Sequence, residues 1–222
     1  MENKNIIIIA VVVIVIIAIL GVIFATGVLN QNNHQNMKTT PFDNDFMEGS
    51  FVGDVELVNK TEKYMQSYED KEHEITYNIS TVDNSSALME IYEIQGVSNP
   101  EHRSYGGNDW NIYFTQAVPG NSSNASDNET MNIIICQCQG KKQGYFIYMI
   151  TKSSSKINST NFLDEGFEVY LQPLLKSLTL KESNDVPKVY EEFGMSKEQF
   201  NQQLELVHQY KAGNRSALNG AQ

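Results

Sequence analysis

The sequence predicts an α+β domain carried on a single N-terminal transmembrane helix. Three observations lead to this fold class: an uncharged apolar run at the start of the chain, strand-like segments through its middle, and helix start and stop signals near its end. The chain has 222 residues, which leaves room for one globular domain once the membrane segment is subtracted.

The apolar run covers residues 6–29 and contains no charged side chain. A helix of this length reaches roughly 36 Å, enough to cross about 30 Å of hydrocarbon with some tilt. We therefore expect a transmembrane helix that anchors the chain in a lipid bilayer. Removal as a signal peptide is the alternative, because Ala25-Thr26-Gly27 offers small residues for cleavage, although the apolar part of a signal peptide is usually only about 7–15 residues long.

The few basic residues near this helix predict its orientation. Lys4 precedes the helix, and the next basic residue, Lys38, comes well after it. The positive-inside rule then places residues 1–5 in the cytoplasm and the remainder outside the cell membrane. Residues 30–46 are polar without a clear period, and we expect them to form an extended linker between the membrane and the domain.

Asn-x-Ser/Thr triplets, the acceptor pattern for N-linked glycans, are unusually frequent. The composition predicts roughly three by chance, and the chain contains eight. An excess indicates an extracellular glycoprotein, while the alternative is that polar loops rich in Asn, Ser and Thr produce such triplets automatically. The candidate acceptors are Asn59, Asn78, Asn84, Asn121, Asn124, Asn128, Asn158 and Asn214.

Residues 47–180 are predicted to form the extracytoplasmic α+β domain. The segment 74–82, EITYNISTV, alternates apolar and polar residues, which is typical of a half-buried strand with Asn78 on its solvent face. Segments 131–138 and 144–151 are apolar on both faces, so they should lie centrally in the sheet and join through a hairpin at 141–144. Further strands are predicted over 50–58, 86–94 and 109–118.

A helix should cover one face of this sheet. Thr160 or Asn161 can cap it, and Pro173 should kink it or shift its start. Its apolar stripe, at helical spacing, consists of Phe167, Leu171, Leu174 and Leu178.

A pair of C-terminal helices is predicted over residues 185–212, followed by a flexible tail at 213–222. Gly194 suits the end of the first helix, and Ser196 with Gln199 forms a capping box at the start of the second. The second helix should either dock on the domain's own sheet or lie in the groove of a protein partner. The residues that would make this contact are Phe200, Leu204 and Val207.

The sequence contains no motif for catalysis, cofactor binding or metal binding, so we expect no cofactor and no enzyme activity. The net charge of −11 argues against a nucleic-acid partner. Cys136 and Cys138 are predicted to be buried apolar residues, and the acidic run around Asp70 a solvated edge. The segment 98–110 is the candidate binding loop, with the alternative that it is a strand connection ending in a core tryptophan; its site residues would be His102, Arg103, Tyr105 and Trp110.

The order of elements resembles PsbP-like domains, in which antiparallel strands and a tryptophan-containing strand precede a closing helix. The motif that carries this resemblance is LLKSLTL at 174–180, while Pro173 and the additional C-terminal helices depart from it. The chain also resembles signal-anchored archaeal cell-surface proteins in its composition. The resemblance implies a non-catalytic binding or assembly module, and an exported hydrolase with an acidic and histidine site is the alternative.

Overall fold

The computed structural model describes residues 38–214 with the exception of 63–64, 95 and 118–129. Within these ranges no helix is both long and apolar enough to cross a membrane. The predicted transmembrane helix, the cytoplasmic N-terminus and the end of the tail lie outside the described residues, and so do the candidate acceptors Asn121, Asn124 and Asn128.

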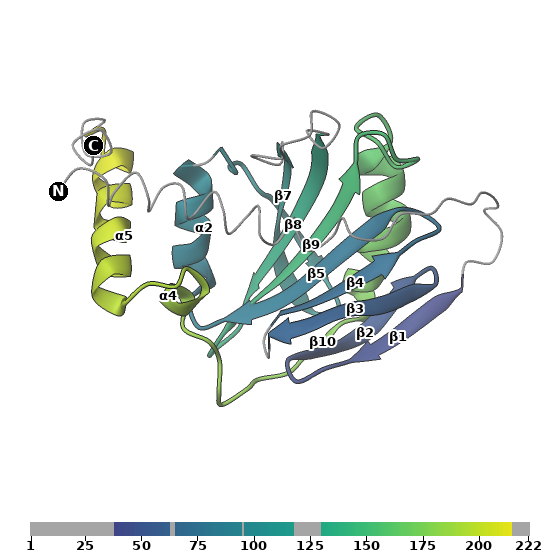
Figure 1. Cartoon of the computed structure of the whole chain (residues 1–222), viewed down its shortest axis with the longest axis horizontal. Coiled ribbons are helices and arrows are strands. Elements are labelled where there is room, and N and C mark those ends of the chain that lie inside the picture. Colours follow the sequence, from purple (N-terminus) through teal and green to yellow (C-terminus); the bar gives the residue numbers. More distant parts are fainter. Residues whose placement is uncertain (1–37, 63–64, 95, 118–129, 215–222) are drawn as a thin grey trace.

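A seven-stranded antiparallel sheet forms the centre of the domain (Figure 1). Its strand order is β3-β4-β5-β9-β8-β7-β6, and every neighbouring pair is antiparallel, which confirms the predicted sheet type. The strands are β3 (Val55–Glu62), β4 (Met65–Asp70), β5 (Ile75–Val82), β6 (Glu101–Tyr105), β7 (Asn108–Ala117), β8 (Met131–Gln139) and β9 (Gly144–Lys152).

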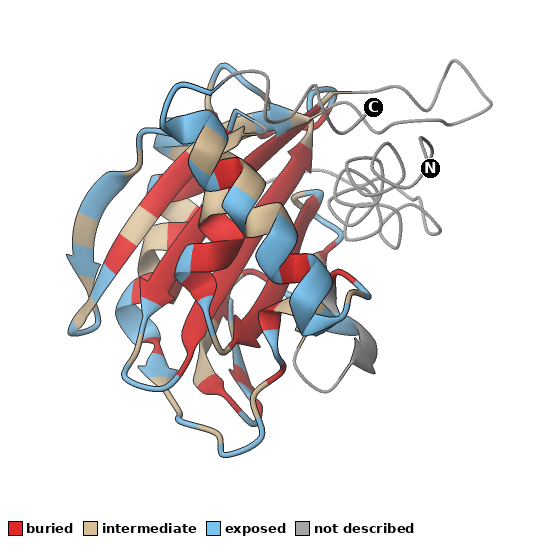
Figure 2. Ribbon diagram, turned by 90° about the vertical axis from the view of Figure 1, so that its left-hand side faces the viewer, coloured by how far each residue is buried: buried red, intermediate tan, exposed pale blue. Residues whose placement is uncertain are grey.

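The two segments predicted to be apolar on both faces are the central strands β8 and β9. They pair from Met131↔Lys152 to Gln139↔Gly144, so the predicted hairpin connects them. Nearly every residue of both strands is buried, and Figure 2 shows buried strands at the centre of the sheet. Cys136 and Cys138 are buried free cysteines on one face of β8, as predicted.

The prediction of a half-buried strand at 74–82 is wrong. All eight residues of β5 are buried, and the side chain of Asn78 is only 1% exposed. The reason is the position of β5 between β4 and β9: Asn78 lies opposite Tyr148, a residue of the second hydrophobic core. An N-linked glycan at Asn78 would therefore have to displace core packing.

Residues 86–94, predicted as a strand, instead belong to helix α2 (Ser85–Ile94), which packs on β8 and β9. Asn84 caps it, since its Oδ1 accepts the backbone N–H of Ala87 at 3.1 Å. The buried residues Leu88, Ile91 and Tyr92 have the spacing of a helix face. The apolar residues of this segment fit both the two-residue period of a strand and the 3.6-residue period of a helix. The helix is favoured because Asn84 caps it and because it covers a face of the sheet.

The two predicted C-terminal helices are present as α4 (Val189–Glu192) and α5 (Lys197–Lys211), which form an outer layer beyond α2 (Figure 1). The capping box is formed: Ser196 Oγ accepts the N–H of Gln199 at 3.2 Å, and Gln199 Oε1 accepts the N–H of Ser196 at 2.9 Å. Phe200 and Val207 are buried and Leu204 is half-buried. The apolar stripe of α5 therefore packs on helices of its own domain rather than on the sheet.

The other face of the sheet is covered by two consecutive helices, the π-helix η3 (Phe162–Leu171) and the α-helix α3 (Gln172–Ser177), where one helix was predicted. The N–H of Gln172 donates to Phe167 O, five residues back, and the next residue, Pro173, has no N–H. The π-helix thus gives way to the α-helix next to Pro173, which cannot donate a backbone hydrogen bond. This agrees with the prediction that Pro173 kinks the helix or shifts its start.

A small antiparallel sheet of order β1-β2-β10 lies beside these helices; its strands are β1 (Thr39–Asp43), β2 (Met47–Val52) and β10 (Thr179–Leu180). Part of the predicted linker 30–46 is therefore strand, which corrects its boundary. Phe42 and Phe46 explain the difference, because both are buried in the core and hold this segment on the domain.

Candidate functional site

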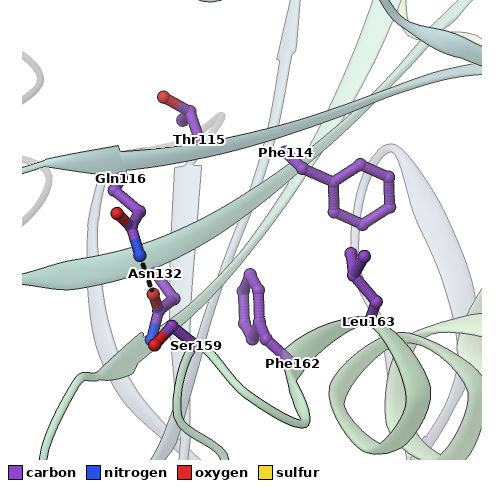
Figure 3. A pocket seen from close by; sticks show the side chains of 7 residues that line it. All are labelled: Phe114, Thr115, Gln116, Asn132, Ser159, Phe162 and Leu163. Carbon is purple, nitrogen blue, oxygen red and sulfur yellow. Dashed lines mark hydrogen bonds between the residues drawn. The ribbon is translucent and has the colours of Figure 1, made fainter.

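A pocket of about 350 Å³ opens between the face of the large sheet and the start of η3 (Figure 3). Its volume lies in the range of small-molecule binding sites. The strands β7 and β8 supply one side of the pocket, and the segment that leads into η3 supplies the other. The lining residues are Phe114, Thr115, Gln116, Asn132, Ser159, Phe162 and Leu163.

Three apolar side chains form one wall of the pocket. Phe114 comes from β7, where an edge contact with Phe167 at 6.0 Å between ring centroids supports its ring. Phe162 and Leu163 are the first two residues of η3; Phe162 is buried, whereas Leu163 is 54% exposed. Gly166 gives Phe162 its space, because a Cβ at that glycine would lie 3.1 Å from the Phe162 ring.

The polar part of the pocket is formed by two amides and a hydroxyl. Gln116 Nε2 donates to Asn132 Oδ1 at 2.8 Å, and Figure 3 shows the Asn132 amide nitrogen directed toward Ser159. Asn132 is 1% exposed, and among the described residues its Nδ2 has no hydrogen-bond partner. A buried donor without an acceptor costs about 1–3 kcal/mol, so this nitrogen is suited to an acceptor from a bound molecule or water.

The pocket carries no formal charge. None of its lining side chains is an acid, a base or a cysteine. Thr115 points to the opposite side of β7 from Gln116 (Figure 3), as alternation along a strand requires. The pocket can therefore bind a neutral molecule through apolar contacts and hydrogen bonds, but its lining side chains include no general acid or base for a reaction.

The predicted binding loop folds as the β6–β7 hairpin, and its four candidate residues do not form one site. Trp110 is 1% exposed and its indole N–H donates to Tyr105 O at 3.3 Å, so the core tryptophan of the alternative prediction is what the structure contains. His102 lies on the other face of the hairpin, where its Nδ1 is 2.6 Å from Asn111 Oδ1.

Arg103 and Tyr105 connect this hairpin to the helices. The guanidinium carbon of Arg103 lies 4.9 Å from the centre of the Phe167 ring, and Tyr105 Oη accepts a hydrogen bond from Gln172 Nε2 at 3.3 Å. These contacts hold the edge of the sheet against η3 and α3, which indicates a structural role for both side chains.

A second cluster of polar groups lies at the turn between β4 and β5. Asp70 is fully buried: its Oδ1 accepts the N–H of His73 at 3.0 Å, and its Oδ2 lies 2.8 Å from His73 Nδ1. The predicted solvated edge is therefore wrong for Asp70. Gly53 makes this burial possible, because a Cβ there would approach Asp70 Oδ2 to 2.1 Å. Burial and, second, the charge of Asp70 raise the pKa of the Tyr77 and Tyr170 hydroxyls.

The Asp70–His73 pair predicts a pH-dependent contribution to stability. The hydrogen bond to Asp70 raises the pKa of His73 above 6.5; Glu72 also raises it, while burial and Lys156 lower it. A raised folded-state pKa means that the contribution is complete below the unfolded-state pKa and is lost as the pH rises through the folded-state pKa. His73→Asn should thus cost more stability at about pH 5.5 than at about pH 8.5.

This prediction can be measured by urea unfolding of the full-length chain, followed by the fluorescence of Trp110, the single tryptophan. His102→Asn is the matched control, because His102 is exposed. A loss of stability that is equal at both pH values would mean that His73 contributes only through packing.

The hydrolase alternative required His102 and a carboxylate to converge with a nucleophile in a pocket. His102 does not line the pocket, and its contact is the Asn111 amide. The thiols are not activated either: burial raises the pKa of Cys136 well above its usual range and that of Cys138 to about 11, so both stay protonated at neutral pH. The described residues contain two acid–histidine pairs, Asp70 with His73 at 2.8 Å and Glu90 with His208 at 2.7 Å, and none of these residues lines the pocket.

Solved structures with a weak similarity of fold include a cyanobacterial protein and a Bacteroides protein. The solution structure of cyanobacterial PsbP (CyanoP) from Synechocystis sp. PCC 6803 matches with a TM-score of 0.43 and 8% identity over 68% of this chain and 98% of that one. A crystal structure from Bacteroides thetaiotaomicron VPI-5482 matches with a TM-score of 0.41 and 7% identity over 72% of this chain.

The chain spans about half of the Bacteroides protein, 54% of its length. No protein-family model matches the chain, and neither does any curated protein. The PsbP-like resemblance noted in the sequence is therefore confirmed as a weak likeness of fold, and it carries no information about ligand or activity.

The pocket residues were missed by the sequence analysis, although two signals were present. Asn132 is the only polar residue among the first five of the apolar run MNIIICQC. Phe114 and Gln116 alternate along β7 and so share the face of the sheet that η3 covers. What the sequence did not reveal is where η3 begins relative to these strands.

Proposed function

We propose that this protein is a membrane-anchored extracytoplasmic module that acts by binding or assembly rather than by catalysis. The observation that carries the binding role is the pocket between β7, β8 and η3. Its lining is neutral, and it includes the amide nitrogen of Asn132, a buried donor without an acceptor among the described residues. Such a site is suited to hold a ligand and lacks the side chains that would transform one.

The proposed location rests on the sequence. Residues 6–29 are long and apolar enough to anchor the chain, and Lys4 favours a cytoplasmic N-terminus. The excess of glycan-acceptor triplets supports an exterior location. Two of the described acceptors, Asn84 and Asn214, are exposed.

Membrane fractionation tests the anchor. The full-length chain should remain in the membrane pellet after an alkaline carbonate wash, because a transmembrane helix is not extracted by charge or pH. A variant that lacks residues 1–37 should move to the soluble fraction, since it has lost the apolar run 6–29 and keeps the domain from strand β1 onward.

Two other outcomes would argue against an uncleaved anchor. Release of the full-length chain by carbonate would show that residues 6–29 do not span the bilayer. A mature chain that begins after Gly27 by mass spectrometry, recovered outside the membrane, would instead show signal-peptide cleavage.

A further inference from the structure

We propose that the pocket binds one residue of a neutral sugar, an assignment that rests on the proposed binding function and specifies its ligand. The geometry combines an apolar wall with opposing amide and hydroxyl groups, and it leaves one buried N–H without an acceptor among the described residues. Each of these features corresponds to a part of a sugar ring.

Charge limits the class of ligand first. No lining side chain carries a charge, so neither an anionic nor a cationic group of a ligand would find an ion-pair partner in the pocket. The net charge of −11 further disfavours anionic ligands by long-range repulsion. A neutral ligand remains.

The arrangement of the lining then favours a sugar ring among neutral ligands. The C–H face of a pyranose can lie against Phe114 and Phe162, which supply the apolar wall. Its hydroxyls both donate and accept hydrogen bonds, as the side chains of Gln116, Asn132 and Ser159 together can. A ring hydroxyl oxygen placed at Asn132 Nδ2 would satisfy the buried donor.

A peptide is another neutral class of ligand, and the position of the pocket disfavours it. An extended peptide usually gains affinity by adding a strand to an open sheet edge. The pocket lies on the face of β7 and β8 that η3 covers. Strand β8 is paired on both sides, with β7 and β9, whereas β6 pairs with β7 only from Asn108 to Ile112, so the pocket residues of β7 lie beyond that pairing. A peptide added along that part of β7 would lie in the plane of the sheet, beside the pocket rather than in it.

NMR titration of the full-length chain in dodecylphosphocholine micelles tests this assignment, because that detergent has no sugar headgroup to compete. The probes are two neutral sugars, glucose and N-acetylglucosamine. Glucuronic acid serves as a charged sugar for comparison, and N-acetylphenylalanine amide serves as a neutral peptide analogue. The side-chain amide resonance of Asn132 reports occupation of the pocket directly. We expect saturable shifts of this resonance with a neutral sugar, and much weaker shifts with the other two probes.

Two leucines of similar exposure supply a variant and its control. Leu163, on the pocket wall, is 54% exposed and Leu57, on edge strand β3, is 50% exposed, so replacing either is compatible with folding. Leu163→Asp should raise the Kd of the neutral sugar by about tenfold, because it introduces a charge and removes apolar contact. Leu57→Asp should leave the Kd unchanged.

The remaining outcomes overturn the assignment. Shifts with the peptide probe alone would assign the pocket to peptides, and no shift with any probe would remove it as a site for these ligands. An equal loss of affinity in both leucine variants would mean that the sugar binds elsewhere. Membrane fractionation is independent of these results, so failure of the anchor and failure of the sugar assignment can be told apart.

Discussion

Phe200→Asp should lower the free energy of unfolding by about 3–5 kcal/mol, the range measured when a large core aromatic is truncated. Phe200 is only 4% exposed, and its ring stacks on Phe193 with 5.8 Å between centroids. The substitution removes this contact and places a charge in an apolar core. For a chain of this size the melting temperature should fall by roughly 10 °C.

The polar contacts between α5 and α2 contribute less to the free energy of unfolding than the burial of Phe200. His208 and Lys211 of α5 pair with Glu90 and Glu93 of α2 at 2.7 Å in each case. These four side chains remain partly exposed, and exposed ion pairs contribute only about 0–1 kcal/mol. Burial of Phe200 and Val207 therefore dominates the attachment of α5.

Gln202→Asp is the matched control, because it adds the same charge two residues away at an exposed position of α5. Its melting temperature should stay within a degree or two of the parent chain. Truncation after Leu180, which removes α4 and α5, should destabilise the domain at least as much as Phe200→Asp. A truncated domain that melts unchanged but no longer co-purifies with a partner would instead assign α5 to partner recruitment.

The elements that were predicted correctly have local signals that no tertiary contact overrides. The capping box at Ser196 and Gln199 satisfies backbone donors within one turn, so α5 begins where the sequence indicates. Strands β8 and β9 are apolar on both faces, which is compatible only with central positions in a covered sheet.

The wrong predictions concern segments whose apolar pattern and composition are compatible with more than one structure. Segment 86–94 satisfies both a strand and a helix pattern, and its helical state depends on the cap at Asn84 and on the uncovered faces of β8 and β9. Polar residues of β5 such as Asn78 suggested solvent exposure, but a neighbouring strand and a helical layer bury them. Burial of polar residues is a tertiary property that alternation cannot reveal.

The candidate site was less predictable than the fold for the same reason. Asn132 resembles any other residue of a buried strand until the position of Gln116 and the start of η3 are known. The π-helical register of η3 places Gly166 against the Phe162 ring and ends at Leu171, two residues before Pro173. No sequence period corresponds to that register.

The central claim, an outward-facing domain on an uncleaved anchor, predicts an all-or-none difference in chemical labelling. The native thiols Cys136 and Cys138 are buried in the strand β8, so they should not react with a maleimide in the folded chain. A cysteine introduced at Lys197, which is exposed on α5, should be the first reactive thiol of the domain. A cysteine introduced at Glu2 lies on the predicted cytoplasmic side.

The most direct test is therefore labelling of intact cells with a membrane-impermeant maleimide, with the parent chain as the unlabelled control. The account predicts that Lys197→Cys is labelled without lysis, whereas Glu2→Cys is labelled only after the cells are lysed. Labelling of Glu2→Cys in intact cells together with protection of Lys197→Cys until lysis would contradict it, because the domain would then face the cytoplasm.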